Sequence, residues 1–113
     1  MKYIIAVIQP DRLEIVAEEL AGEEIHVMTV SEVLGRGRQK GVTEVYRSQV
    51  QPGNLLRKIK IEIAISDDRG WHAVDAIKRA AWTGGIGDGK IFILDLEDCV
   101  RIRTGEQGEM ALA

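Results

Sequence analysis

The sequence has 113 residues, one cysteine and a formal net charge of −3, from 15 basic and 18 acidic side chains. A chain of this length forms one domain that buries roughly 65% of its unfolded surface, and the lone cysteine excludes an internal disulfide. The acidic balance argues against nucleic acid as a partner. The lack of an apolar leader or of an apolar run of about 18 residues makes us expect a cytoplasmic protein.

The first part of the chain predicts a strand, a helix and a second strand. An apolar run over residues 3–8 ends at Gln9 and Pro10, as expected for a buried strand followed by a turn. A helix is predicted from Asp11 to Gly22, with an apolar face made of Leu13, Val16, Ala17 and Leu20. Partial alternation over residues 26–34 predicts the second strand.

Residues 35–56 form a long connection without a sustained hydrophobic period. They include three glycines before Val42 and a Pro52-Gly53 turn. Loops of this length in a compact domain are uncommon and are usually functional or disordered. A hairpin over residues 43–50 is an alternative, but it would have little core of its own to bury. We expect a mobile projection.

The second part of the chain repeats the order of the first. Residues 58–65 alternate strictly, with four isoleucines on one face and Lys58, Lys60, Glu62 and Ala64 on the other. A helix capped by Asp67 or Asp68 follows and ends at Gly84. Strands are expected over residues 91–96 and, as a short final element, over residues 100–103.

This order of elements is typical of the ferredoxin-like βαββαβ fold. That α+β fold has an antiparallel four-stranded sheet with two helices on one face. No helices remain to cover the other face, so its apolar residues are expected to pack against copies of the same chain. An oligomer is therefore predicted.

A glycine-rich stretch, TGGIGDGKIF at residues 83–92, is the first candidate site. Its glycines leave backbone amides unshielded, and Lys90 adds a charge at the start of a strand, an arrangement that suits a polyphosphate. A P-loop would need Ser or Thr after the lysine and then a helix, whereas Ile91 and a strand follow. The alternative is a simple glycine turn between helix and strand.

Basic residues form the second candidate. Arg101 and Arg103 are separated by one residue, so on an extended segment both side chains would point to the same face, available together for phosphate oxygens. One third of the chain also holds a group of seven cations, Arg36, Arg38, Lys40, Arg47, Arg57, Lys58 and Lys60. Local positive potential therefore matters more than the net charge.

Three motifs resemble the PII nitrogen-regulatory signal-transduction proteins: GRQKGVTEVYR at residues 37–47, TGGIGDGKIF at 83–92 and RIRTGE at 101–106. The resemblance covers almost the whole chain and implies one domain over residues 1–113, assembled as a homotrimer with nucleotide between subunits. It assigns a partner-docking T-loop to about residues 36–56, a phosphate-binding B-loop to about 83–90 and a C-terminal segment to 101–106.

The resemblance also implies a set of ligand residues. For ATP or ADP these are Thr29, Gly35, Gly37, Arg38, Glu62, Ala64, Gly87, Asp88, Gly89 and Lys90, with Arg101 and Arg103 from a neighbouring subunit. For 2-oxoglutarate they are Gln39, Lys40, Gly41 and Lys58. Gln39 would also help to hold the Mg²⁺ ion that bridges the two ligands, and Lys58 would pair with a carboxylate. A dicarboxylate beside a triphosphate requires such cations.

Several positions depart from the family pattern. Gly85 replaces a usual lysine, and an early Lys-Pro-Phe reads Gln9-Pro10-Asp11. Gln51 and Gln49 stand where other members carry a uridylylated tyrosine and a phosphorylated serine, so covalent regulation by either route is not expected. Tyr46 and Arg47 remain as expected partner contacts. The partners implied are an ammonium channel, which would bring the protein to the membrane, or an enzyme of nitrogen metabolism.

Two functions follow as hypotheses. The first is a non-enzymatic sensor in which ATP, ADP and 2-oxoglutarate change the affinity of the T-loop for a partner. The second is a slow ATPase that uses Lys90 and the arginines, or an adenylate-energy sensor that does not respond to 2-oxoglutarate. No nucleophile with a neighbouring base stands out in the sequence, which favours the sensor.

Overall fold

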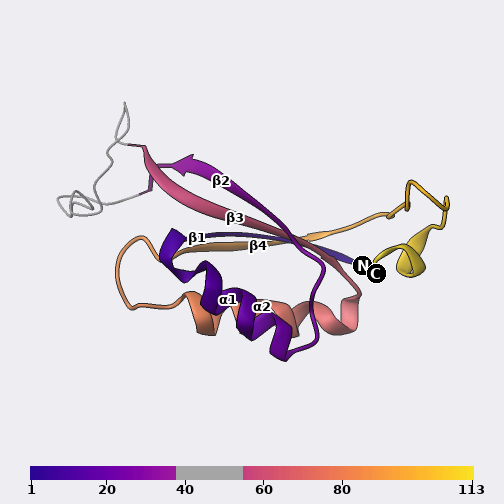
Figure 1. The fold of residues 1–113 in the computed structure, drawn as a ribbon, viewed down its shortest axis with the longest axis horizontal. Coiled ribbons are helices and arrows are strands. Elements are labelled where there is room, and N and C mark those ends of the chain that lie inside the picture. The colour runs from indigo at the N-terminus through magenta and orange to yellow at the C-terminus, as the bar shows by residue number, and fades with distance from the viewer. Residues whose placement is uncertain (38–54) are drawn as a thin grey trace.

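A computed structural model describes residues 1–37 and 55–113 and confirms the predicted ferredoxin-like fold. Four antiparallel strands lie in the order β2-β3-β1-β4, with both helices on one side of the sheet (Figure 1). The elements are β1 (Lys2–Ile8), η1 (Pro10–Arg12), α1 (Leu13–Gly22), β2 (Thr29–Gly35), β3 (Leu56–Ile65), α2 (Asp67–Ala81), β4 (Gly89–Asp95) and η4 (Gly108–Ala111). In the described part of the chain, no helix is both long and apolar enough to cross a membrane.

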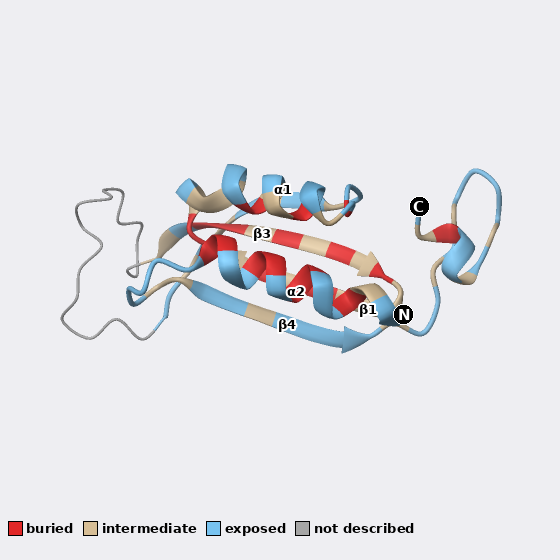
Figure 2. Cartoon of the chain, turned by 90° about the horizontal axis from the view of Figure 1, so that it is seen from below, coloured by how far each residue is buried: buried red, intermediate tan, exposed pale blue. Residues whose placement is uncertain are grey.

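The core lies between the sheet and the two helices. Strand β1 is central, and its Ile4 pairs with Ile63 on β3 and with Ile93 on β4. Because side chains alternate along a strand, this register turns every second residue of β1 and β3 toward the helices. Val16 and Leu20 of α1 are fully buried against them. Figure 2 shows buried residues along the sheet-facing sides of both helices.

The opposite face of the sheet is open in the single chain. The strand register gathers apolar side chains there, since Ile5 lies opposite Phe92 and Tyr3 opposite Leu94. Phe92 is 49% exposed and Leu94 is 47% exposed. Large apolar side chains that share an exposed face mark an interaction surface more often than a free surface.

The element boundaries differ from the predicted ones by up to three residues. Strand β2 begins at Thr29 instead of residue 26, and β4 begins at Gly89 instead of residue 91. Asp11 lies in the 3-10 turn η1 that precedes α1, and Ser66, not an aspartate, occupies the N-cap of α2. Gly35 and Leu56 are paired strand residues, so the long connection is shorter than predicted. The expected mobile projection and hairpin fall on residues 38–54, which lie outside the described residues.

The predicted final strand over residues 100–103 is wrong. Val100 makes only an isolated bridge to Gln107, and residues 102–104 form a turn. The Gly105 amide donates to the carbonyl of Arg101 at 2.8 Å, which closes the turn. Gly105 adopts a φ of 76°, a conformation that glycine accepts readily and that reverses the chain. Arg101 and Arg103 therefore do not share one face of an extended segment.

Candidate functional site

The glycine loop between α2 and β4 is folded around its own carboxylate. Asp88 accepts hydrogen bonds from the amide of Thr83 at 2.7 Å, from the Thr83 hydroxyl, and from the amide of Gly84 at 2.9 Å. Partial burial acts to raise the pKa of Asp88, but these hydrogen bonds outweigh it and hold the pKa below its usual value. Asp88 is therefore a charged structural centre of the loop.

Two glycines give the loop its path. Gly87 and Gly89 have φ values of 99° and 106°, in the left-handed region that other residues rarely adopt. At Gly89 the backbone also passes so close to β1 that a Cβ atom would overlap the carbonyl oxygen of Val7. This junction between loop and strand therefore requires glycine for both reasons.

The carbonyl of Gly87 joins the loop to the sheet. Gln9 Nε2 donates to this oxygen at 2.7 Å, and Lys58 Nζ lies 3.5 Å from it. Gln9 follows the end of β1 and Lys58 belongs to β3, and both are more than nine-tenths buried. Gln9 was not predicted as a site residue, although its position departs from the family pattern.

A cavity of about 520 Å³ opens between this loop and the end of β2. Its lining residues are Val7, Gly35, Arg36, Gly37, Lys58, Gly87, Gly89, Lys90 and Phe92. Among the described residues of this lining, all three charged side chains are cations, and four glycines bring backbone close to the space. Cations together with unshielded backbone amides suit a phosphate or carboxylate ligand.

The cavity brings together six of the predicted ligand residues: Gly35, Gly37, Lys58, Gly87, Gly89 and Lys90. Asp88, also predicted, is not in the lining, because its carboxylate bonds within the loop. Val7 and Phe92 line the cavity but were not predicted as site residues, and Arg36 was predicted only as one of the seven clustered cations. Val7 lies directly opposite Lys90 in the register of β1 and β4, a relationship that the sequence alone does not show. Predicted residues Arg38, Gln39, Lys40, Gly41, Tyr46 and Arg47 lie outside the described residues.

The remaining predicted nucleotide residues of the sheet lie farther along its open face. Thr29 is directly opposite Glu62, and Ala64 follows on the same side of β3. The Tyr3 hydroxyl donates to Glu62 Oε2, while Lys60 Nζ lies 3.7 Å from Oε1. The hydrogen bond to Glu62, with burial adding to it, raises the pKa of Tyr3 above its usual value.

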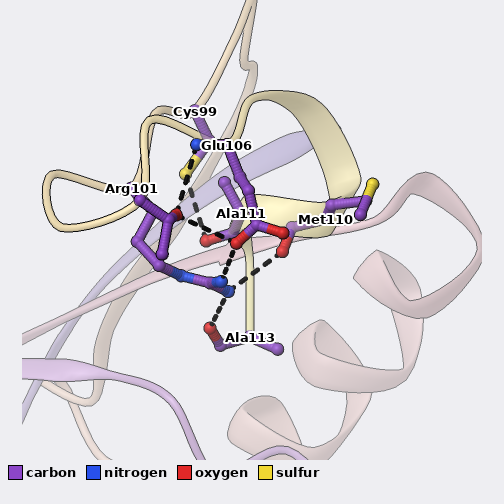
Figure 3. A network of polar contacts seen from close by, with 7 residues as sticks. Cys99, Arg101, Glu106, Met110, Ala111 and Ala113 are labelled. Carbon is purple, nitrogen blue, oxygen red and sulfur yellow. Dashed lines mark hydrogen bonds and ion pairs between the residues drawn. The ribbon is translucent and has the colours of Figure 1, made fainter.

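Arg101 lies at the other end of the sheet, where it organises the C-terminal segment (Figure 3). Its guanidinium pairs with the carboxylate of Glu106 and donates to the carbonyls of Met110 at 2.9 Å and Ala113 at 2.6 Å. Figure 1 places this segment beyond the end of the sheet opposite the α2–β4 loop. Within one chain, Arg101 and Arg103 therefore do not reach the cavity.

Comparison with known proteins identifies relatives along nearly the whole chain. The family model described as nitrogen regulatory protein P-II matches residues 1–106. Nitrogen regulatory protein GlnK of Escherichia coli K12 is 48% identical over 112 residues, which cover 99% of this chain and 100% of the relative. Nitrogen regulatory protein P-II 2 of Methanothermobacter thermautotrophicus is 50% identical over 112 residues, with 99% and 97% covered. Nitrogen regulatory protein P-II of Bradyrhizobium diazoefficiens is 51% identical over 108 residues, with 96% of each chain covered.

Proposed function

The chain belongs to the nitrogen regulatory protein P-II family, and on this premise we propose that it is a non-enzymatic regulator that binds ATP or ADP and controls partner proteins. The observation that carries the proposal is the cavity at the glycine loop. There Lys58, Lys90 and Arg36 surround a space bordered by glycine backbone. Charge-assisted hydrogen bonds contribute about 1.5–3 kcal/mol each, so such a site can hold a polyphosphate firmly.

We assign the phosphates of the nucleotide to Gly87, Gly89 and Lys90. The nucleoside is assigned to Thr29, Glu62 and Ala64. All of them lie on the loop or on the open face of the sheet. We further propose that 2-oxoglutarate binds with Mg-ATP. Lys58 would pair with one of its carboxylates, and Gln39 would help to hold the Mg²⁺ ion. A buried lysine in the cavity lining supports this assignment, because a buried cation gains strongly from an anionic partner.

We also propose that the protein assembles as a homotrimer. The apolar open face around Phe92 and Leu94 would be covered by neighbouring subunits, which would also bring Arg101 and Arg103 to the nucleotide. Partner control would run through the T-loop with Tyr46 and Arg47. An ammonium channel or an enzyme of nitrogen metabolism would be the partner.

Calorimetric titration with ATP, with and without Mg²⁺ and 2-oxoglutarate, tests the ligand scheme. Lys58→Gln should lose at least tenfold in 2-oxoglutarate affinity while retaining ATP binding, because it removes a charge-assisted bond. Lys60→Gln, two residues along the same face of β3 but outside the cavity lining, is the matched control. Absence of ATP binding by the unmodified chain would refute the proposal.

Two alternatives give different results in the same experiment. An adenylate-energy sensor would bind ATP without any response to 2-oxoglutarate. A slow ATPase would release phosphate steadily at saturating Mg-ATP, and Lys90→Gln would abolish that turnover.

A further inference from the structure

The carbonyl of Gly87 accepts a hydrogen bond from Gln9 and lies near the ammonium of Lys58. An anionic ligand would attract the charged Lys58 side chain but not the neutral Gln9 side chain. Gln9 Nε2 donates at 2.7 Å, whereas the Lys58 ammonium lies at the longer distance of 3.5 Å. An ammonium is drawn toward a bound carboxylate or phosphate, since a charge-assisted bond is about twice as strong as a neutral one. The Gln9 amide carries no charge, so an anion attracts it less strongly and it keeps its hydrogen bond to Gly87.

The position of the Gly87 carbonyl matters because it sets the direction of the peptide that follows it. Gly87 and Gly89 both have positive φ values and neither carries a side chain that could anchor the loop by packing. Asp88 ties the loop to its own first residues, Thr83 and Gly84, not to the sheet. Gln9 joins it to the end of β1, 78 residues away in the sequence.

We propose that Gln9 is a positioning residue of the nucleotide site: it holds the glycine loop on the sheet while Lys58 turns from Gly87 to an anionic ligand. This inference rests on the proposed nucleotide-binding function and gives Lys58 and Gln9 different roles in it. Lys58 would respond to the ligand, and Gln9 would keep the loop amides in place throughout. Gln9 itself would not touch the ligand.

The test compares variants that differ in the donor at this position. Gln9→Met has nearly the same length but no N–H group, so among the described side chains the Gly87 carbonyl keeps only the more distant Lys58 donor and ATP affinity should fall about tenfold. Gln9→Lys restores a donor and should bind ATP within about threefold of the unmodified protein. Hydrogen exchange of residues 83–89 should be faster in Gln9→Met than in Gln9→Lys.

The coupling to 2-oxoglutarate separates positioning from general stability. In Gln9→Met, Lys58 would be the side-chain donor left to Gly87 among the described residues, so adding 2-oxoglutarate with Mg-ATP should accelerate exchange in the loop, whereas in the unmodified protein it should not. If Gln9→Met does not fold, Gln9→Leu, which also lacks an N–H donor and carries no charge, replaces it with the same expected results.

The outcomes distinguish the two proposals. If the unmodified protein binds ATP and Gln9→Met binds it equally well, or if Gln9→Lys is weakened as much as Gln9→Met, the positioning role is overturned and the proposed function stands. If the unmodified protein does not bind ATP, the proposed function is overturned and this inference with it.

Discussion

Gly89 lies against Val7 so closely that the backbone carbonyl of Val7 occupies the place where a Cβ atom of residue 89 would be. Gly89→Ala should therefore push β4 away from β1 at the mouth of the cavity and also strain a residue whose φ is 106°. We expect a loss of about 3 kcal/mol or more in the free energy of unfolding, measured by urea denaturation. Gly85→Ala is the control, since its Cβ would meet only the Thr83 hydroxyl at 3.4 Å. Equal stability of the two variants would contradict this account of the junction.

Asp88 should titrate below its ordinary pKa of 3.8, because Thr83 and Gly84 donate hydrogen bonds to the charged form. A lowered pKa in the folded state means that Asp88 stabilises the fold above its unfolded pKa and that this contribution is lost as the pH falls through the folded pKa. Thr83→Val removes one donor and should bring the pKa of Asp88 back toward the ordinary value. NMR titration of the side-chain carboxyl group measures the pKa of Asp88 in the unmodified protein and in Thr83→Val. An unshifted Asp88 in the unmodified protein would refute the proposed role of this carboxylate in the loop.

Tyr3 should ionise above its ordinary pKa of 10.0, first because its hydroxyl donates to Glu62 and then because it is partly buried. The raised pKa means that the stabilisation is complete below the unfolded pKa and is lost as the pH rises through the folded pKa. Near-ultraviolet absorbance during alkaline titration should show this high-pH step in the unmodified protein. The step should disappear in Tyr3→Phe and move to lower pH in Glu62→Gln. A titration unaffected by Glu62→Gln would rule out the hydrogen bond as the main cause.

Arg101→Ala should loosen the C-terminal segment without unfolding the domain. The guanidinium bonds to Glu106, Met110 and Ala113, which all lie beyond the sheet and the two α-helices. Hydrogen exchange of residues 106–113 should approach the rate of a free chain, while the strands keep their protection. Arg103→Ala, outside these bonds, should leave that exchange unchanged. Slow exchange in Arg101→Ala would mean that other contacts hold the segment.

Local patterns were sufficient for most of the fold. The strict alternation of residues 58–65 predicted β3 and its buried face, and the apolar spacing of Val16 and Leu20 predicted the face of α1. The four-glycine loop followed by Lys90 identified the candidate site. The predicted ends of helices and strands were displaced by up to three residues, because the few residues at an end carry little periodic signal. In the segment after β4, a strand was predicted over residues 100–103, but the chain reverses at Gly105, and among the described residues Val100 makes only an isolated bridge to Gln107.

The sequence by itself determined the order of elements, the helix faces and the chemistry of the glycine loop, because each depends on residues within one or two turns of one another. Only the tertiary structure decided that Gln9 and Lys58 converge on Gly87 and that Val7 and Phe92 border the cavity. These relationships depend on the register of β1 against both β3 and β4. A register is set by how whole strands pack on the helices, so it cannot be read from any single segment.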